Sequence, residues 1–215
     1  MSGLALFDLD NTLIRRDDAF RRWARRLIAE HGLDRAELDW LIAADQSGFA
    51  PRDQFLAAVG ARLGLPGPVC DIAEYHRGME ALIEIRPTVV AGITRLRSAG
   101  WQVGVVTNGD AVGQRGKLLA LGLPELVDGW VVSGIEGVHK PDRRIFEIAA
   151  ERCGVELTAG GWMVGDNRLA DIAGGHGCGL RTIWIAGFGP QQGGPDPDHV
   201  VTDVLDAFEI LHGTH

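Results

Sequence analysis

The sequence predicts an α/β fold, a doubly wound parallel sheet with an inserted all-helical domain. Two observations support this prediction. From residue 87 to the carboxyl end, short apolar runs alternate with segments of helical periodicity, which is the pattern of a parallel sheet covered by helices on both faces. One more apolar run lies near the amino end, and residues 17–84, which follow it, show helical periodicity only.

The first strand is expected at Leu4–Phe7, which is apolar at every position, as in a strand buried on both faces. Helical spacing then begins at Ala19. It recurs at Leu38–Ile42, Phe55–Leu63 and Val69–Ile83. We therefore expect residues 16–86 to form a helical cap inserted into an α/β core made of residues 1–15 and 87–215.

The rest of the predicted core follows in alternating order. Helices are expected over Val89–Ser98, Val112–Leu121, Arg143–Cys153, Leu169–His176 and Val204–Leu211, and strands over Gln102–Val106, Gly129–Val132, Trp162–Val164 and Arg181–Ile185. Residues Gly187–Pro197 are rich in Gly, Gln and Pro, which predicts an exposed loop.

Composition narrows the class of protein. A net charge of −8 disfavours binding to nucleic acid or to an anionic membrane, because both normally require a basic face. No stretch of about 18 apolar residues occurs, and the three cysteines lack a CxxC pair. We expect a cytoplasmic protein with buried thiols and a small-molecule partner. The sequence leaves its oligomeric state open.

Polar residues follow three of the predicted strands. Asp8 and Asp10 follow the first, Thr107 and Asn108 follow Gln102–Val106, and Asp166 follows Trp162–Val164. Ligands of open parallel sheets bind at the carboxyl ends of strands, so these side chains should converge. Carboxylates crowded together repel one another and call for a cation. Oxygen ligands favour Mg²⁺ as that cation.

Lysine is rare in this chain. The sequence has 19 arginines but only two lysines, Lys117 and Lys140. A lysine in a candidate site is therefore improbable as an accident of composition. Lys140 is followed by Pro141 and lies between the second and third groups of polar strand ends.

Four segments together carry a resemblance. Phe7–Leu13 reads FDLDNTL, Val106–Gly109 reads VTNG, His139–Asp142 reads HKPD, and Val164–Asn167 reads VGDN, followed by Asp171. In this order they resemble the four signatures of the haloacid dehalogenase-like (HAD) hydrolase superfamily, in the phosphatase branch with a cap inserted after the first motif. The resemblance spans most of the predicted core.

The resemblance implies roles for the two aspartates of the first motif. Asp8 would be the nucleophile that forms an aspartyl-phosphate, and its carboxylate would also bind Mg²⁺. Asp10 would protonate the leaving oxygen and then deprotonate the attacking water. Its backbone carbonyl would be a second metal ligand.

Roles for the remaining motifs follow from the same resemblance. Thr107 and Asn108 would bind phosphoryl oxygens, and Lys140 would neutralise charge that grows in the transition state. Asp166 would be a metal ligand. Asp171 would orient metal-bound water or the lysine.

Alternatives remain at the level of single motifs and of activity. Asp10–Thr12 or Thr107–Gly109 alone is compatible with an ordinary turn, and Asp171 is compatible with the first turn of any helix. Asp10 disfavours a dehalogenase, because a halide leaves without a proton. A phosphomutase of the β-phosphoglucomutase type retains all four motifs and stays open, and a noncatalytic phospholigand-binding protein is a weaker alternative. The sequence does not identify the phosphate ester.

Overall fold

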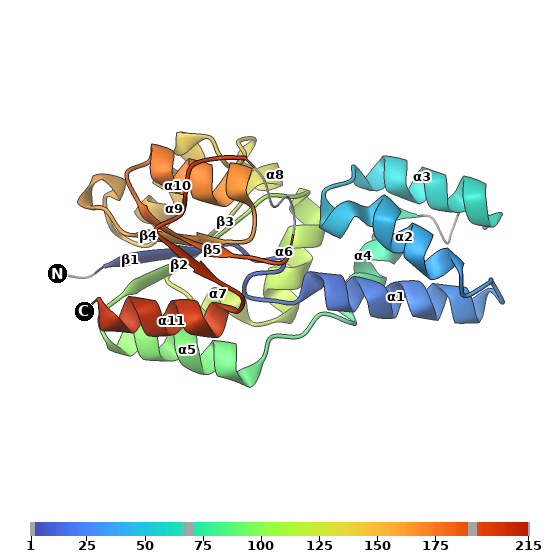
Figure 1. The fold of residues 1–215 in the computed structure, drawn as a ribbon, viewed down its shortest axis with the longest axis horizontal. Coiled ribbons are helices and arrows are strands. Elements are labelled where there is room, and N and C mark those ends of the chain that lie inside the picture. The colour runs from blue at the N-terminus through green and yellow to red at the C-terminus, as the bar shows by residue number, and fades with distance from the viewer. Residues whose placement is uncertain (1–2, 66, 68–70, 189–192, 215) are drawn as a thin grey trace. The chain divides into compact units, whose positions relative to one another are not determined.

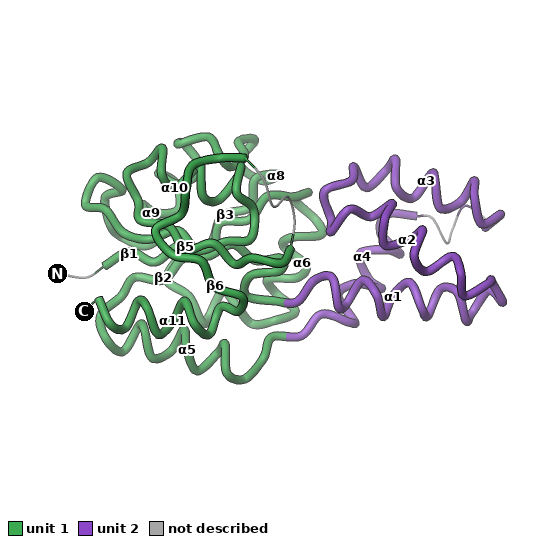
Figure 2. The backbone as a smooth tube through the Cα atoms, viewed as in Figure 1, with its two compact units in different colours: residues 1–14, 85–215 green, residues 15–84 purple. Residues whose placement is uncertain are grey.

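The computed structural model describes residues 3–65, 67, 71–188 and 193–214. The chain divides into two compact units (Figure 2). Unit 1 consists of Met1–Ile14 and Ile85–His215, and unit 2 consists of Arg15–Glu84. Unit 2 is thus inserted into unit 1 directly after the first strand and its following loop.

Unit 1 is built on a six-stranded sheet in the order β3-β2-β1-β4-β5-β6, and every pair of neighbours is parallel. The strands are β1 (Leu4–Phe7), β2 (Gln102–Thr107), β3 (Gly129–Val132), β4 (Trp162–Gly165), β5 (Arg181–Ile185) and β6 (His199–Val201). The predicted doubly wound α/β class is confirmed. β1 lies at the centre, where its carboxyl end is flanked by those of β2 and β4.

Helices cover both faces of this sheet (Figure 1). The helices of unit 1 are α5 (Pro87–Ser98), α6 (Ala111–Ala120), α7 (Leu123–Leu126), α8 (Ser133–Glu136), α9 (Arg143–Arg152), α10 (Ala173–Gly177) and α11 (Val204–Gly213). Leu4 and Leu6 of β1 join a buried cluster with Phe146 of α9. On the opposite face, the ring of Phe7 lies 5.4 Å from that of Phe208 of α11.

Two parts of the carboxyl-terminal half differ from the sequence prediction. β6 was not predicted, because three residues of intermediate or full exposure at a sheet edge are too short to show a period. The predicted helix Leu169–His176 begins instead as a π-helical turn over Arg168–Ile172 and continues as α10. The described part of the predicted loop 187–197 contains no helix or strand, and residues 189–192 lie outside the described residues.

Unit 2 is all-helical. Its helices are α1 (Arg16–Glu30), α2 (Glu37–Asp45), α3 (Arg52–Leu63) and α4 (Ile72–Glu80). Its core is aromatic, with Trp23 of α1 packed 5.1 Å from Tyr75 of α4 between ring centroids. The sequence placed the start of the last helix at Val69, which lies outside the described residues.

Two of the three cysteines, Cys153 and Cys178, are described, and both are free thiols in the interior of unit 1. Burial raises the pKa of the Cys153 thiol to about 12, so this sulfur stays protonated and unreactive. Both thiols serve as small apolar core groups, as expected. Cys70 lies outside the described residues.

Candidate active site

The carboxyl ends of three adjacent strands bring the predicted site residues together. Asp8 follows β1, Thr107 ends β2, and Asp166 follows β4. The backbone N–H of Asp8 donates to the carbonyl of Val164 at 2.9 Å, which extends the pairing of β1 and β4 to the first aspartate. The register of this parallel pairing therefore places Asp8 and Asp166 side by side at the same edge of the sheet.

Lys140 lies at the centre of this group. Its ammonium Nζ donates to Asp8 Oδ1 at 2.7 Å and to the carbonyl of Val106 at 2.7 Å. It also forms an ion pair with Asp171 Oδ1 at 2.6 Å. The Lys140 side chain is only 1% exposed. Its two carboxylate partners raise the pKa of Lys140 against the opposing effect of burial, so it remains charged.

Three buried carboxylates, those of Asp8, Asp166 and Asp171, each place an oxygen within 4.8 Å of the others. Burial is the main reason that the pKa of Asp8 rises to about 7, and the negative charges of Asp171 and Asp10 add to the effect. Burial, followed by the charges of Asp8 and Asp171, also raises the pKa of Asp166. Both carboxyl groups therefore hold a proton to a higher pH than an exposed aspartate does.

This donor set fits a divalent cation. Three carboxylates face one ammonium, which leaves an excess of two negative charges in a buried place. Carboxylate oxygens are the ligands that Mg²⁺ takes, usually one or two of them together with water and substrate phosphate. Asp171 lies within the group, whereas the resemblance gave it only an orienting role. The side chain of Asp10 is not part of the group.

The Asn108 side chain has a different partner from the one expected. Its Nδ2 donates to the backbone carbonyl of Lys140 at 2.9 Å, and its Oδ1 accepts from the backbone N–H of Lys140 at 2.9 Å. Both ends of the amide thus hold the backbone that carries the lysine. Thr107 lies at the end of β2 with 1% exposure, and its Oγ1 accepts a hydrogen bond from Gln114.

Asp10 contacts two residues of α6 that sequence reasoning did not assign to the site. Lys117 Nζ lies 2.8 Å from Asp10 Oδ1 and 2.5 Å from Oδ2, and Gln114 Nε2 donates to Oδ2 at 3.0 Å. In the sequence, the only indication that Lys117 belongs to the site was the rarity of lysine in this chain. Each of the two lysines in the chain contacts one aspartate of the first motif.

A family model for haloacid dehalogenase-like hydrolases matches residues 3–179. The chain belongs to this family. The predicted membership is confirmed, and with it the expectation that the chain is an enzyme of the hydrolase class.

Two similar proteins of this family are named as phosphatases. The glyceraldehyde 3-phosphate phosphatase of Methanopyrus kandleri is 32% identical, over 98% of this chain and 93% of the relative. That of Pyrococcus abyssi is 31% identical, over 86% of this chain and 82% of the relative. These relatives support the predicted phosphatase branch. The solved structure of the HAD-hydrolase YfnB from Bacillus subtilis, bound to magnesium, has a TM-score of 0.76 and 24% identity, with 98% of each chain covered. That likeness confirms the fold.

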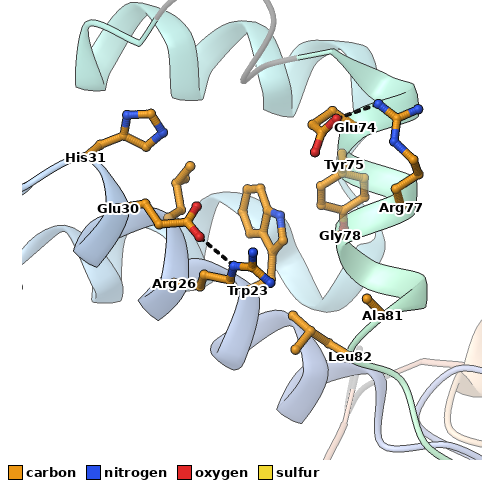
Figure 3. A pocket seen from close by; sticks show the side chains of 11 residues that line it. Trp23, Arg26, Glu30, His31, Glu74, Tyr75, Arg77, Gly78, Ala81 and Leu82 are labelled. Atoms are coloured by element: carbon orange, nitrogen blue, oxygen red, sulfur yellow. Dashed lines mark hydrogen bonds and ion pairs between the residues drawn. The ribbon is translucent and has the colours of Figure 1, made fainter.

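Unit 2 of this HAD-like hydrolase has a cavity of its own, about 460 Å³ in volume, between α1 and α4 (Figure 3). Trp23 and Tyr75 contribute aromatic surface to it, and the ion pairs Arg26–Glu30 and Glu74–Arg77 lie at its edges. None of the described residues that line it belongs to the four motifs. Within the described parts of the chain, no helix combines the length and apolar character needed to span a membrane.

Proposed function

We propose that the protein is a magnesium-dependent phosphatase that hydrolyses a small-molecule phosphate monoester through an aspartyl-phosphate on Asp8. The observation that carries this proposal is the arrangement of Asp8. Its Oδ1 is held at 2.7 Å by Lys140, and Asp166 and Asp171 lie beside it as candidate metal ligands. A carboxylate paired in this way is oriented for attack.

The site residues divide the proposed chemistry among them. A carboxylate oxygen of Asp8 attacks phosphorus, and the bond between phosphorus and the ester oxygen breaks. Asp10 gives its proton to the departing oxygen. Asp10 then takes a proton from the water that attacks the aspartyl-phosphate, the bond between phosphorus and Asp8 breaks, and inorganic phosphate leaves with the Asp8 carboxylate restored.

Phosphoryl charge needs neutralising at the same site. The Lys140 ammonium supplies one positive charge. Asp8, Asp166 and the backbone carbonyl of Asp10 would hold Mg²⁺, with Asp171 as a further oxygen donor. When bound, the ion would supply positive charge that favours the ionised form of Asp8 and balances the phosphoryl oxygens. Thr107 would donate its hydroxyl to a phosphoryl oxygen. Both ends of the Asn108 side-chain amide bond to the backbone of Lys140, so Asn108 would contact a phosphoryl oxygen through its own backbone N–H.

The substrate class rests on the relatives. Two phosphatases whose names specify glyceraldehyde 3-phosphate align with 86% and 98% of the chain. A small phosphorylated metabolite is therefore the first class of substrate to test. Unit 2 corresponds to the helical cap domain expected from the sequence. We place the protein in the cytoplasm, where such metabolites occur.

The test of this proposal is phosphate release in the presence of Mg²⁺ from p-nitrophenyl phosphate and from a panel that includes glyceraldehyde 3-phosphate. Asp8→Asn keeps the shape of the side chain but removes the nucleophile, so we expect no turnover. Asp10→Asn should slow turnover by roughly 10²–10⁴-fold, the usual contribution of general acid–base catalysis. The matched control is Asp206→Asn, because Asp206 is an exposed aspartate of unit 1 on α11. Full activity in Asp8→Asn would rule out the assigned nucleophile.

A further inference from the structure

Lys117 contacts the acid–base residue of the proposed mechanism, although none of the four motifs contains it. Its ammonium donates to both oxygens of the Asp10 carboxylate. The Lys117 side chain is 13% exposed, and that of Asp10 is 22% exposed. An ion pair so far removed from solvent is less screened than the usual surface pair, whose contribution is small.

Gln114 approaches the same carboxylate from one turn earlier in α6. Residues three apart lie on the same face of a helix, so Gln114 and Lys117 point in the same direction. The Gln114 amide Nε2 lies 3.0 Å from Asp10 Oδ2, 2.9 Å from Thr107 Oγ1 and 2.8 Å from the Asn108 carbonyl. It therefore connects the first motif to the second.

Contacts at its amino end hold α6 against the end of β2. The helix starts shortly after β2 ends, and Asp110 caps it by accepting from the backbone N–H of Gly113 at 2.7 Å. A Cβ added at Gly109 would lie 2.6 Å from Gln114 Cγ, so the glycine permits the close approach of this side chain. The helix face that carries Gln114 and Lys117 is thus set against the end of β2.

We propose that Lys117 is a positioning residue that, together with Gln114, fixes the carboxylate of Asp10 relative to Asp8. This inference rests on the proposed function and names a residue beyond the four motifs. An aspartate side chain can turn about two bonds, and proton transfer needs the carboxylate within hydrogen-bond reach of the reacting oxygen. Lys117 holds the ionised carboxylate, which is the form that acts as base, and restricting its rotation before the water attacks lowers the entropic part of the barrier to the second displacement.

The test compares Lys117→Met, which retains the length of the side chain without its charge, with Lys117→Arg, which can again donate to both carboxylate oxygens. Arg115→Met is the matched control, because it removes one positive charge from an exposed position of the same helix. Each variant is measured in the full chain with Mg²⁺, using p-nitrophenyl phosphate under steady-state and rapid-mixing conditions.

p-Nitrophenolate leaves without a proton, so the first displacement depends little on Asp10, whereas hydrolysis of the aspartyl-phosphate requires Asp10 as base. In Lys117→Met we expect kcat to fall by about 10-fold or more, a part of the full acid–base contribution. A burst of about one p-nitrophenolate per enzyme molecule should precede the slow phase, because the second step has become limiting. Lys117→Arg should recover much of the loss, and Arg115→Met should behave as wild type.

Three results would overturn the positioning role. One is an unchanged kcat in Lys117→Met. Another is a lower rate that comes with a reduced burst amplitude and a slower first step, as general damage to the fold would produce. The third is a crystal structure of Lys117→Met in which the Asp10 carboxylate has not moved. A wild-type protein that releases phosphate from none of the tested esters would overturn the proposed function itself. The three results above require an active wild type and overturn only the positioning role, so the two failures are distinguishable.

Discussion

Gly165 shows how one hydrogen in place of a side chain can maintain an acidic site. It is the last residue of β4, directly before Asp166, and a Cβ built there would lie 2.2 Å from Asp171 Oδ2 and 2.3 Å from Asp171 Cγ. No side chain other than hydrogen fits in that distance. The Asp171 carboxylate, which accepts from the backbone N–H of Asn167 at 2.9 Å, occupies the place of the missing methyl group.

Gly165→Ala should displace Asp171 and disturb its ion pair with Lys140. We expect Mg²⁺ affinity and kcat to fall by about 10–100-fold, the range seen when groups that orient metal ligands are changed. Calorimetric titration with Mg²⁺ and steady-state kinetics measure the two effects. Gly177→Ala is the control, because nothing lies within 4 Å of a Cβ at that position. If both variants bound Mg²⁺ equally well, the carboxylate of Asp171 would not depend on this contact.

The motifs predicted which residues lie close together but not which hydrogen-bond partner each side chain has. Asp8, Thr107 and Asp166 converge because the carboxyl ends of neighbouring parallel strands meet at one edge of the sheet. That argument concerns the backbone. It could not show that the Asn108 amide turns to Lys140, nor that Lys117 reaches Asp10, because both depend on the rotation of loops and helices in the packed molecule.

At the scale of elements, each helix of unit 2 supplies one residue to a buried polar cluster. Arg16 begins α1, Asp45 ends α2, Arg52 begins α3, and Tyr75 lies in α4. The Asp45 carboxylate is paired with both guanidinium groups, at 2.7 Å from Arg16 Nη2 and 2.6 Å from Arg52 Nη1. The Tyr75 hydroxyl accepts from the same two arginines. One carboxylate thus ties the ends of three helices together.

Asp45→Ala should destabilise unit 2 by about 3–5 kcal/mol, because it removes the buried carboxylate that pairs with both Arg16 and Arg52. Asp39→Ala removes an exposed carboxylate from the same helix and should change little. Hydrogen exchange of the full chain, followed by peptide, reports the opening of each unit separately. Exchange that accelerates in residues 16–80 of Asp45→Ala but not of Asp39→Ala is the expected result, and equal protection in the two variants would contradict it.

Elements were predictable where the sequence has a sustained period. Apolar runs marked five of the six strands, and helical spacing marked the long helices. The edge strand β6 and the π-helical turn before α10 were not predictable, because each is short and depends on hydrogen bonds with neighbouring segments. The Asp45 cluster was equally hidden, since it joins residues that are far apart in the sequence.

At the scale of the whole molecule, the acidic site costs stability when no metal is bound. The pKa of Asp8 is raised from 3.8 to about 7, so the folded protein holds this proton more tightly than the unfolded chain does. A raised pKa of this kind contributes stability below the unfolded value, and the contribution is lost as the pH rises through the folded value. Asp166 acts in the same direction.

In EDTA, we therefore expect the thermal unfolding midpoint to fall between pH 4 and pH 8 by more in wild type than in Asp8→Asn, which has no carboxyl group to titrate at this position. Mg²⁺ binds the ionised carboxylates in competition with protons, so its stabilising effect should be larger at pH 8 than at pH 5. Calorimetric scans with and without the metal measure both differences. A Mg²⁺ effect that is independent of pH would show that these carboxylates do not take up protons as the geometry implies.

The place of unit 2 in the chain also affects the order of folding during synthesis. β1 pairs with β2 and β4, both of which follow unit 2 in the sequence. The ribosome therefore completes unit 2, whose contacts are comparatively local, before either partner of the central strand exists. Leu4–Phe7, an uncharged apolar segment, must wait unpaired throughout that interval. The insertion thus means that β1, which leads into the proposed nucleophile Asp8, is synthesised before the other strands of its sheet and is one of the last to be protected from aggregation.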